Sequence, residues 1–224
     1  LTLDSQQQLE AFVSDGEPVE AGKVIARMVG FADVMLSAER VALNLLQRLS
    51  GVATLTNQYA KAVEGTGAGI ADTRATTPGL RLLERYAVNL GGGYTGRYGL
   101  DDGVVITANH ISLLGGVGSA VKTAKEKLGY LHKVCVEIAS ENDLKEAIAA
   151  GADVVVLEDL TAAEFGRLAG IASELSSSVG IECTGRIAPE NVREYAEAGA
   201  QLIRIEALTS SAPAANISFK VQPF

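Results

Sequence analysis

Apolar runs and amphipathic segments alternate through the second half of the chain, and this alternation limits the possible folds more than any other feature. Each unit is roughly 20–26 residues long and pairs a strand of the buried type with a helix. The expected strands cover 132–140, 153–159, 179–185 and 201–207. The expected helices cover 141–151, 161–175 and 188–199. This pattern predicts α/β architecture with a parallel sheet.

Polar residues close almost every expected strand, which favours an α/β barrel over an open sheet. In a barrel, the carboxyl ends of all strands meet at one mouth, where the site is built. No Gly-x-Gly-x-x-Gly turn, which an open dinucleotide-binding sheet requires, joins a strand to a helix. The residues at the strand ends are Asp72, Thr73, Arg74, Thr107, Asn109, His110, Glu137, Glu158, Asp159, Glu182, Thr184, Arg186, Arg204 and Glu206.

The stretch from Asp72 to His110 carries the densest group of such residues. Asp-Thr-Arg ends an apolar run, and a helix is expected from Leu80 to Leu90. A triple glycine and Arg97 follow, before a second apolar run ends in polar residues. Two strands would then deliver polar groups to the same end of the sheet, as barrel enzymes do.

The first part of the chain has a different character. Turn residues separate short strand-like runs within 1–35, which indicates a small β-rich piece. A long helix is expected from Ser37, a possible N-cap, to about Val63. Gly51 within it indicates either a close approach of another backbone or a simple kink. We therefore expect a β-rich domain at 1–36, a linking helix at 37–64, a barrel at 65–208 and a segment at 209–224 that returns to the N-terminal domain.

Charge and composition exclude several classes of function. The net charge of −8 and the lack of a basic run argue against nucleic-acid binding. No apolar run approaches the roughly 20 residues of a membrane span, and no signal peptide is visible. Two cysteines without metal-binding spacing fit buried thiols in a reducing, cytoplasmic setting. Because the chain opens on Leu1, we expect a fragment or a processed product.

The mixture of acids and arginines at the strand ends suits an anionic, possibly phosphorylated substrate, with or without a divalent metal. Glu137 faces the expected barrel interior, where a carboxylate is costly unless it is paired, so we interpret it as functional. Arg74 and Arg97 either serve function or pair with neighbouring acids. For His110, a structural role and a catalytic role stay equally open.

Five segments together make the chain resemble the quinolinate phosphoribosyltransferase family over nearly its whole length. They are ERVALNLLQRLSGVATLT (39–56), DTRATTPGLRLLERYAV (72–88), the GGG, GR and GL residues within 91–100, NHI (109–111), and ENVREYAEAGA with EALTSSAPAANIS (190–218). The resemblance implies an incomplete α/β barrel behind an N-terminal α/β-sandwich domain, truncated here. It also implies a cytoplasmic homodimer, or a higher oligomer of dimers, in which each subunit lends an arginine to its partner's site.

The reaction implied by the resemblance joins an aromatic acid, quinolinate, to phosphoribosyl pyrophosphate with Mg²⁺, and releases pyrophosphate and CO₂. Arg40 matches the arginine lent across the dimer, and Arg74 and Arg97 match those that hold substrate carboxylates. Glu137 matches an acid near the ribose and the metal. By the same resemblance, Glu158 is expected to be catalytic and to bind the metal. Asn109 and His110 are expected to bind substrate. The residues expected to bind phosphate are Thr184, Gly185 and Arg186.

The chain departs from the family pattern at several positions of this pocket. Ala75 and Thr107 stand where the family has lysines, and Gly96 stands where it has a histidine. The other departures are Ala108 for an aspartate, Glu158-Asp159 for Asp-Asn, and Arg186 and Glu206 for two glycines. Each lost charge-assisted contact to a buried carboxylate should cost about 1.5–3 kcal/mol. These residues therefore predict a diverged paralogue with an altered acceptor or donor.

Two other hypotheses stay open. The chain could be a catalytically inactive homologue that acts as a binding or regulatory subunit. A relative encoded with molybdate-transport genes is a weaker match through residues 72–88.

Overall fold

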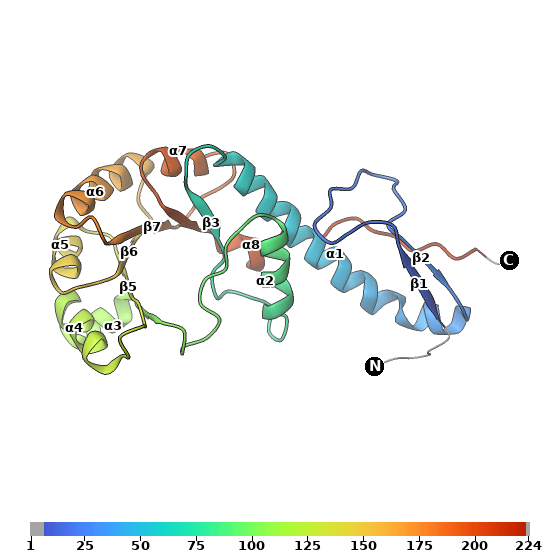
Figure 1. Ribbon diagram of the computed structural model, residues 1–224, viewed down its shortest axis with the longest axis horizontal. Helices are drawn as coiled ribbons and strands as arrows, with labels where there is room; N and C mark the ends of the chain where they lie inside the picture. The colour runs from blue at the N-terminus through green and yellow to red at the C-terminus, as the bar shows by residue number, and fades with distance from the viewer. Residues whose placement is uncertain (1–6, 223–224) are drawn as a thin grey trace.

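The computed structural model describes residues 7–222 and has two parts joined by one long helix. An α/β barrel lies at one end, and a two-stranded hairpin lies at the other (Figure 1). The hairpin pairs β1 (Gln8–Ala11) with β2 (Ala26–Val29) antiparallel. Helix α1 (Ala32–Ala62) runs from the hairpin to the barrel.

Six parallel strands form the barrel sheet, in the order β3-β8-β7-β6-β5-β4. Their bounds are β3 (Gly69–Ala71), β4 (Val104–Ile106), β5 (Val134–Ile138), β6 (Val154–Glu158), β7 (Gly180–Thr184) and β8 (Leu202–Arg204). Within the described residues β3 and β4 do not pair, so the barrel is incomplete, as predicted. Tyr94 instead forms a parallel bridge with Ala71 along the free side of β3.

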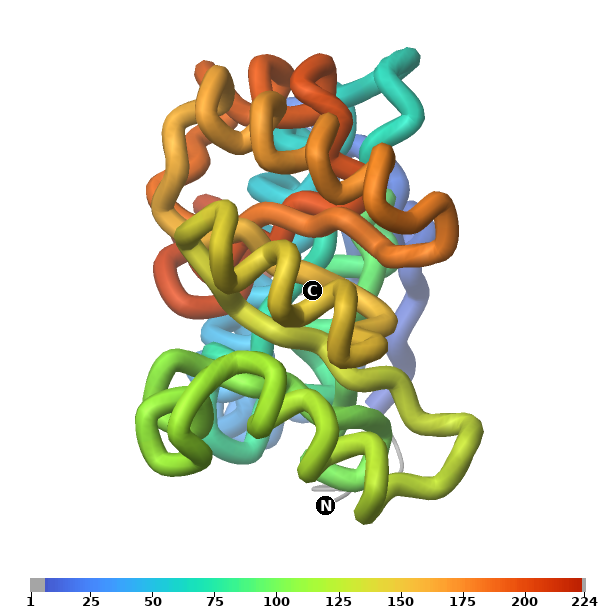
Figure 2. The backbone as a smooth tube through the Cα atoms, turned by 90° about the vertical axis from the view of Figure 1, so that its left-hand side faces the viewer, coloured from blue at the N-terminus to red at the C-terminus, as the bar shows by residue number. Residues whose placement is uncertain are grey.

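Helices cover the outside of this curved sheet. They are α2 (Arg81–Leu90), α3 (Ala108–Leu114), α4 (Val117–Lys127), α5 (Glu141–Ala149), α6 (Ala162–Leu175), α7 (Val192–Glu197) and α8 (Ala207–Ser210). Helices α4, α5 and α6 lie side by side on it (Figure 2). The main core fills the layer between these helices and the strands, with Phe165 and Leu144 among its fully buried side chains. Thr161 accepts the hydrogen bond that caps α6, as a helix N-cap should.

A second, smaller cluster lies on the other face of the sheet, inside the barrel. It consists of Cys135, Val154 and Val156, with Val105 packed against them. Successive residues of a strand point to opposite faces, so the residues two positions further along share this inner face. The inner face thus leads from an apolar floor to Glu137 on β5 and Glu158 on β6, toward the carboxyl ends of the strands.

The predicted start of the long helix was wrong. Helix α1 begins at Ala32, five residues before Ser37. Phe31 is at the N-cap position, and its side chain makes no capping hydrogen bond. The Ser37 hydroxyl donates a hydrogen bond to the carbonyl of Asp33 inside the helix, so it caps nothing. No helix of the described chain combines the length and the apolar character that crossing a bilayer requires.

The C-terminal segment returns along α1, and Gly51 is the point of closest approach. A β-carbon at Gly51 would lie 2.0 Å from the carbonyl oxygen of Pro213. Next to it, the amide of Ala215 donates to the carbonyl of Gln47, whose side chain donates to the carbonyl of Ile217. Close approach, rather than a kink, therefore explains the glycine. The segment 218–222 forms no strand in the structure.

We expect Gly51→Ala to destabilise the fold, although alanine is the better helix former by about 1 kcal/mol. The added methyl group displaces a backbone carbonyl rather than a flexible side chain. Gly170→Ala in α6 is the matched control, because nothing lies within 4 Å of the β-carbon that it would add. Urea unfolding should show a lower midpoint for Gly51→Ala and an unchanged or higher one for Gly170→Ala. Equal midpoints would show that the returning segment gives way at no cost.

Candidate functional site

Charged side chains gather at the carboxyl ends of the barrel strands, and Arg97 lies among them. Burial lowers the pKa of Arg97, and the positive charges of Arg74 and Arg204 lower it further. Cys135 and Glu137 act in the opposite direction. Residues from the loop after β3, from the loop between α2 and β4, and from strands β5 and β8 therefore share one electrostatic environment. We call this region the barrel mouth.

Glu137 is the half-buried carboxylate of the barrel mouth. Burial raises its pKa, and the negative charge of Glu158 raises it further, whereas Arg204, Arg97 and His110 lower it. The ionised carboxylate is thus held at some cost, close to three cationic or potentially cationic groups. Such a group is suited to face positive charge that a ligand brings.

Helix α2 fixes both arginine-bearing loops through Arg85. Its fully buried guanidinium forms an ion pair with Asp72 at 3.0 Å, and the Asp72 side chain is also fully buried. Arg85 donates to the carbonyl of Arg97 at 2.7 Å, and Asp72 accepts from the amide of Gly96, also at 2.7 Å. The ring of Tyr98 lies 4.2 Å from the guanidinium carbon. The end of β3 and the glycine loop are therefore tied to one another.

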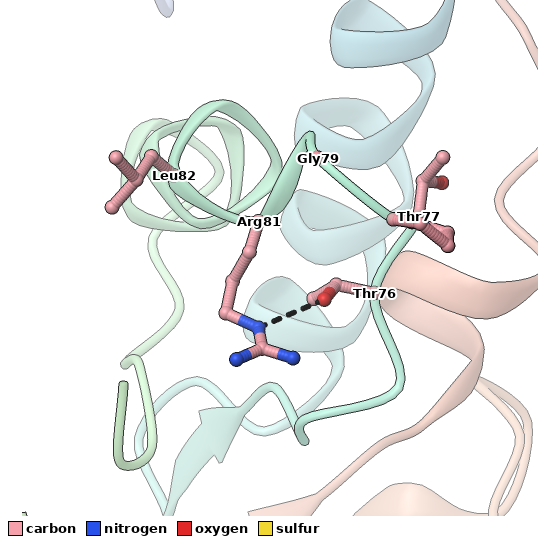
Figure 3. Close-up of a pocket in the computed structure, with 6 residues that line it drawn as sticks. Thr76, Thr77, Gly79, Arg81 and Leu82 are labelled. Carbon is pink, nitrogen blue, oxygen red and sulfur yellow. Dashed lines mark hydrogen bonds between the residues drawn. The ribbon is translucent and has the colours of Figure 1, made fainter. Parts of the chain in front are cut away.

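Arg81, one turn before Arg85, makes a second link between these loops. It donates from Nε to the Thr76 hydroxyl and from Nη1 to the carbonyl of Tyr98, each at 3.0 Å. Figure 3 shows it reaching back from α2 to the loop that follows β3. The hollow there measures about 430 Å³ and is lined by Thr76, Thr77, Pro78, Gly79, Arg81 and Leu82.

Glu84 anchors the same loop from the other side. This fully buried carboxylate accepts from the amide and the hydroxyl of Thr77 and from Arg48 of α1. Arg48 also donates to the carbonyls of Thr209 and Ala212. Helices α1, α2 and α8 therefore meet at this ion pair, and the loop that carries Arg74 rests on it.

His110 has a structural partner in this chain. Its Nδ1 lies 2.8 Å from the Thr107 hydroxyl and accepts from the Thr107 amide at 3.2 Å, which forms a capping box at the start of α3. Asn109 and His110 are both exposed. The structure thus gives His110 a capping role, in a position from which a protonated ring would lower the pKa of Glu137.

The three residues proposed for phosphate binding lie together where β7 ends. The Thr184 hydroxyl donates to the carbonyl of Arg204 at 3.3 Å, and Gly185 and Arg186 are exposed. Asp159 follows β6 beside them in a left-handed conformation, with φ of 53°. A hollow of about 260 Å³ opens there, lined by Asp159, Leu160, Arg186 and Tyr195.

Arg40 lies apart from this group. It is exposed near the start of α1, which is beside the hairpin rather than the barrel (Figure 1).

For a metal, the mouth provides two neighbouring carboxylates, Glu137 and Glu158. Among residues 7–222 no group of three or more His, Cys, Asp or Glu side chains could enclose an ion. Mg²⁺ commonly binds through one or two carboxylates, water and substrate phosphates, so a dedicated protein cage is not required. Repulsion between the two carboxylates also fits a cation shared between them.

Sequence reasoning missed the residues that hold the site in place. Arg48, Glu84 and Arg85 are absent from the residues predicted to matter. Glu84 and Arg85 follow one another inside an apolar helix pattern, and two such neighbouring charges were a usable signal. The sequence predicts that Cys135 is a buried free thiol. It is buried, but its Sγ accepts a hydrogen bond from Arg204 at 3.2 Å.

Sequence comparison places the two parts of the chain in one family. The family description "Quinolinate phosphoribosyl transferase, N-terminal domain" matches residues 2–50, and the corresponding C-terminal domain matches residues 52–220. The chain belongs to the quinolinate phosphoribosyltransferase family. The resemblance inferred from the motifs is therefore confirmed.

Family members with curated names cover almost all of the chain. The probable nicotinate-nucleotide pyrophosphorylase [carboxylating] of Bacillus subtilis is 40% identical over 222 residues, which is 98% of this chain and 75% of that protein. The human nicotinate-nucleotide pyrophosphorylase [carboxylating] is 34% identical over 216 residues, which is 96% of this chain and 73% of the human protein.

Solved structures of the family have the same fold. The nicotinate-nucleotide pyrophosphorylase of Francisella tularensis superposes with a TM-score of 0.91 at 36% identity, over 98% of this chain and 77% of that one. NadC from Streptococcus pyogenes gives a TM-score of 0.89 at 32% identity, over 97% and 76% of the two chains. These matches confirm the predicted fold class.

Asp72→Asn should destabilise the protein strongly, because Arg85 would keep its charge in a fully buried position without a counter-charge. Breaking a buried pair in this way costs about 3–5 kcal/mol. Lys145→Gln removes an exposed pair with Glu141 and should cost under about 0.5 kcal/mol. Guanidinium unfolding of the two variants measures the difference. A loss of less than about 1 kcal/mol for Asp72→Asn would contradict the anchoring role of the pair.

Glu137→Gln should raise the melting temperature at pH 7. A carboxyl group whose pKa is raised in the folded state binds its proton more tightly there than in the unfolded chain, so stability falls as pH rises between the two values. The amide cannot ionise and escapes this cost, and the advantage should vanish below about pH 4.

Glu141→Gln is the control of opposite sign. The hydrogen bond from Lys145 lowers the pKa of Glu141, with Arg167 acting in the same direction. This variant should therefore melt no higher than the parent at pH 7. Thermal melts from pH 4 to pH 8 measure both variants, and a lower melting temperature for Glu137→Gln at pH 7 would contradict the assigned direction.

Proposed function

We propose that this protein transfers the phosphoribosyl group of phosphoribosyl pyrophosphate to a pyridine or other aromatic carboxylic acid, in a pocket altered from the family pattern. The observation that carries the proposal is the state of Arg74 at the barrel mouth. Its Nε is buried, and within residues 7–222 it has no hydrogen-bond partner. A buried donor of this kind calls for a ligand or an ordered water.

Arg97 complements Arg74. It uses only Nη1 within the described chain, for the carbonyl of Gly103 at 2.9 Å, which leaves its other donors for a ligand. Guanidinium groups bind carboxylates through paired hydrogen bonds, so the two arginines can hold and orient an aromatic acid. Arg85 and Arg81 fix the loops that carry them, which keeps this orientation before the acid arrives.

Glu137 supplies negative charge where the ribose would react. Displacement at the anomeric carbon passes through an oxocarbenium-like state, and a nearby carboxylate stabilises the positive charge that develops. Burial and the negative charge of Glu158 raise the pKa of Glu137, so its ionised form gains further when such positive charge appears. Mg²⁺, held by Glu137 and Glu158 together with the substrate phosphates, would neutralise the departing pyrophosphate.

The altered pocket limits the acceptor. Ala75, Gly96 and Thr107 bring no positive charge to a place where the family pattern has three cationic or potentially cationic groups. An acid with fewer negative groups than a dicarboxylate needs fewer such contacts. Arg186 and Glu206, both exposed at the ends of β7 and β8, bring opposite charges to the proposed phosphate side.

We also propose a cytoplasmic homodimer in which Arg40 contributes to the mouth of the partner subunit. Arg40 is exposed in the first third of α1, and the start of this helix lies at the hairpin rather than at the barrel (Figure 1). The two buried free thiols suit a reducing compartment.

The reaction is tested with Mg²⁺, phosphoribosyl pyrophosphate and a panel of pyridine and benzoic acids. We expect pyrophosphate release with at least one acid, and a loss of about tenfold or more in kcat/KM for Arg97→Gln. Arg167→Gln, which alters an exposed pair between α6 and α5, is the control and should leave kcat/KM unchanged. No release with any acid, together with no calorimetric binding of phosphoribosyl pyrophosphate, would support the inactive binding or regulatory subunit instead.

The altered pocket itself is tested by restoring the family residues with Ala75→Lys, Gly96→His and Thr107→Lys. Gly96 can accept a side chain, since its β-carbon would meet Asp72 at an ordinary 3.4 Å and Arg85 at 3.7 Å. The triple variant should gain turnover of quinolinate relative to the parent. Efficient quinolinate turnover by the unmodified chain would contradict the altered pocket without contradicting the transferase.

A further inference from the structure

Arg204 crosses the inside of the barrel. It lies on β8, and its Nη2 is 3.2 Å from Sγ of Cys135 on β5. Strands β7 and β6 separate β8 from β5 in the sheet, so this contact spans the interior rather than following the sheet. Cys135 belongs to the small apolar cluster on the inner face. The guanidinium therefore lies on the floor of the barrel mouth.

Two neighbours hold Arg204 there. Nη2 forms an ion pair with Glu182 of β7 at 2.5 Å, and the side chains of Arg204 and Glu182 are 22% and 14% exposed. The Cys135 thiol stays neutral, since burial raises its pKa to about 11 against the effect of Arg204. Among residues 7–222, Glu182 alone therefore compensates the charge of Arg204 by direct contact.

Most of the hydrogen-bonding capacity of Arg204 is unused. Within residues 7–222 both protein contacts engage Nη2, and Nε and Nη1 donate to no protein atom. Arg48 and Arg85, in contrast, each engage more than one nitrogen in fixing helices and loops. Arg204 resembles Arg74 and Arg97, which also have donors without a partner in the described part of the chain, and its positive charge reaches Arg97.

We propose that Arg204 is a third anion-contacting arginine of the barrel mouth and that it helps to determine which acidic substrate binds there. Its free donors take an oxyanion, either a ring carboxylate of the acceptor or a phosphate of the donor. The proposal rests on the proposed phosphoribosyl transfer. Arg204 would supply from the barrel floor one of the positive charges that Ala75, Gly96 and Thr107 do not supply from the rim.

Glu182 sets the strength of this contact. It competes with the substrate for the same guanidinium, because an ion pair at 2.5 Å satisfies part of the charge that an anion would otherwise compensate. Glu182→Gln removes the negative charge and keeps the shape of the side chain, so it should make the Arg204 guanidinium more available to the ligand. If the ion pair were purely structural, its loss would only weaken the fold, and the substrate would bind no more tightly.

The test measures binding by calorimetry with three probes: pyridine-2,3-dicarboxylate, pyridine-3-carboxylate and phosphoribosyl pyrophosphate with Mg²⁺. The main variant is Glu182→Gln with Arg204→Gln, which removes one charge of each sign and leaves two amides that can hydrogen-bond to one another. We expect at least one probe to bind about tenfold more weakly or worse. Weaker binding of the acids alone assigns the carboxylate to Arg204, and weaker binding of the phosphoribosyl donor alone assigns the phosphate.

Two single variants and a surface control complete the test. Glu182→Gln should bind the affected probe more tightly than the parent. Arg204→Lys should bind it more weakly than the parent but more tightly than the paired-amide variant, because lysine keeps the charge without the planar fork. Arg167→Gln should leave all three affinities unchanged. Melting curves establish that the paired-amide variant is folded.

Unchanged affinities in the folded paired-amide variant would overturn the role of Arg204 while leaving the transferase intact. If the unmodified protein binds none of the probes and releases no pyrophosphate, the proposed function fails, and the role of Arg204 fails with it.

Discussion

Two ion pairs at successive positions of α2 hold the barrel mouth together. Glu84 and Arg85 are both fully buried and have opposite charges, and each pairs with a different part of the chain. Burying two charges is expensive, and further hydrogen bonds to hydroxyl, amide and carbonyl groups offset the cost. Such pairs contribute position more than net stability, because few other arrangements satisfy so many donors and acceptors at once. Within residues 7–222, Nη1 of Arg85 is the exception, since it is buried without a hydrogen-bond partner.

This constraint divides the arginines of the barrel into two groups. Arg48 and Arg85 have much of their hydrogen-bonding capacity engaged within the protein, so they fix helices and loops. Considering residues 7–222, Arg74, Arg97 and Arg204 keep donors free at the mouth. Arginines that are fixed by the protein lie behind arginines that keep donors for a ligand. This arrangement is expected of a preorganised anion site, where the entropy cost of ordering side chains is met during folding.

The sequence was informative where a local pattern decides the outcome. Buried parallel strands are apolar on both faces, so the runs around Val136, Val155 and Ile181 were predictable, and the polar residues after them marked the mouth. Contacts between distant segments were not predictable in this way. The hydroxyl of Ser37 could cap a helix or bond inside one, and only the packing around α1 decides between them. The partner of Arg85, likewise, lies on another element.

The order of the strands has a consequence for how the chain folds. Strand β3 is the first strand of the sheet along the chain, and its strand partner β8 is the last. One edge of the backbone that leads into Asp72 and Arg74 therefore stays unpaired until the final strand has left the ribosome, while Tyr94 can pair with the other edge earlier. Local units from β5 to β7 can form early, whereas the join between β3 and β8 closes a long loop and should come late. Barrel closure is thus a late event, whereas the contacts of Arg85 with Asp72 and Arg97 join segments that are close in sequence and can form before β8 arrives.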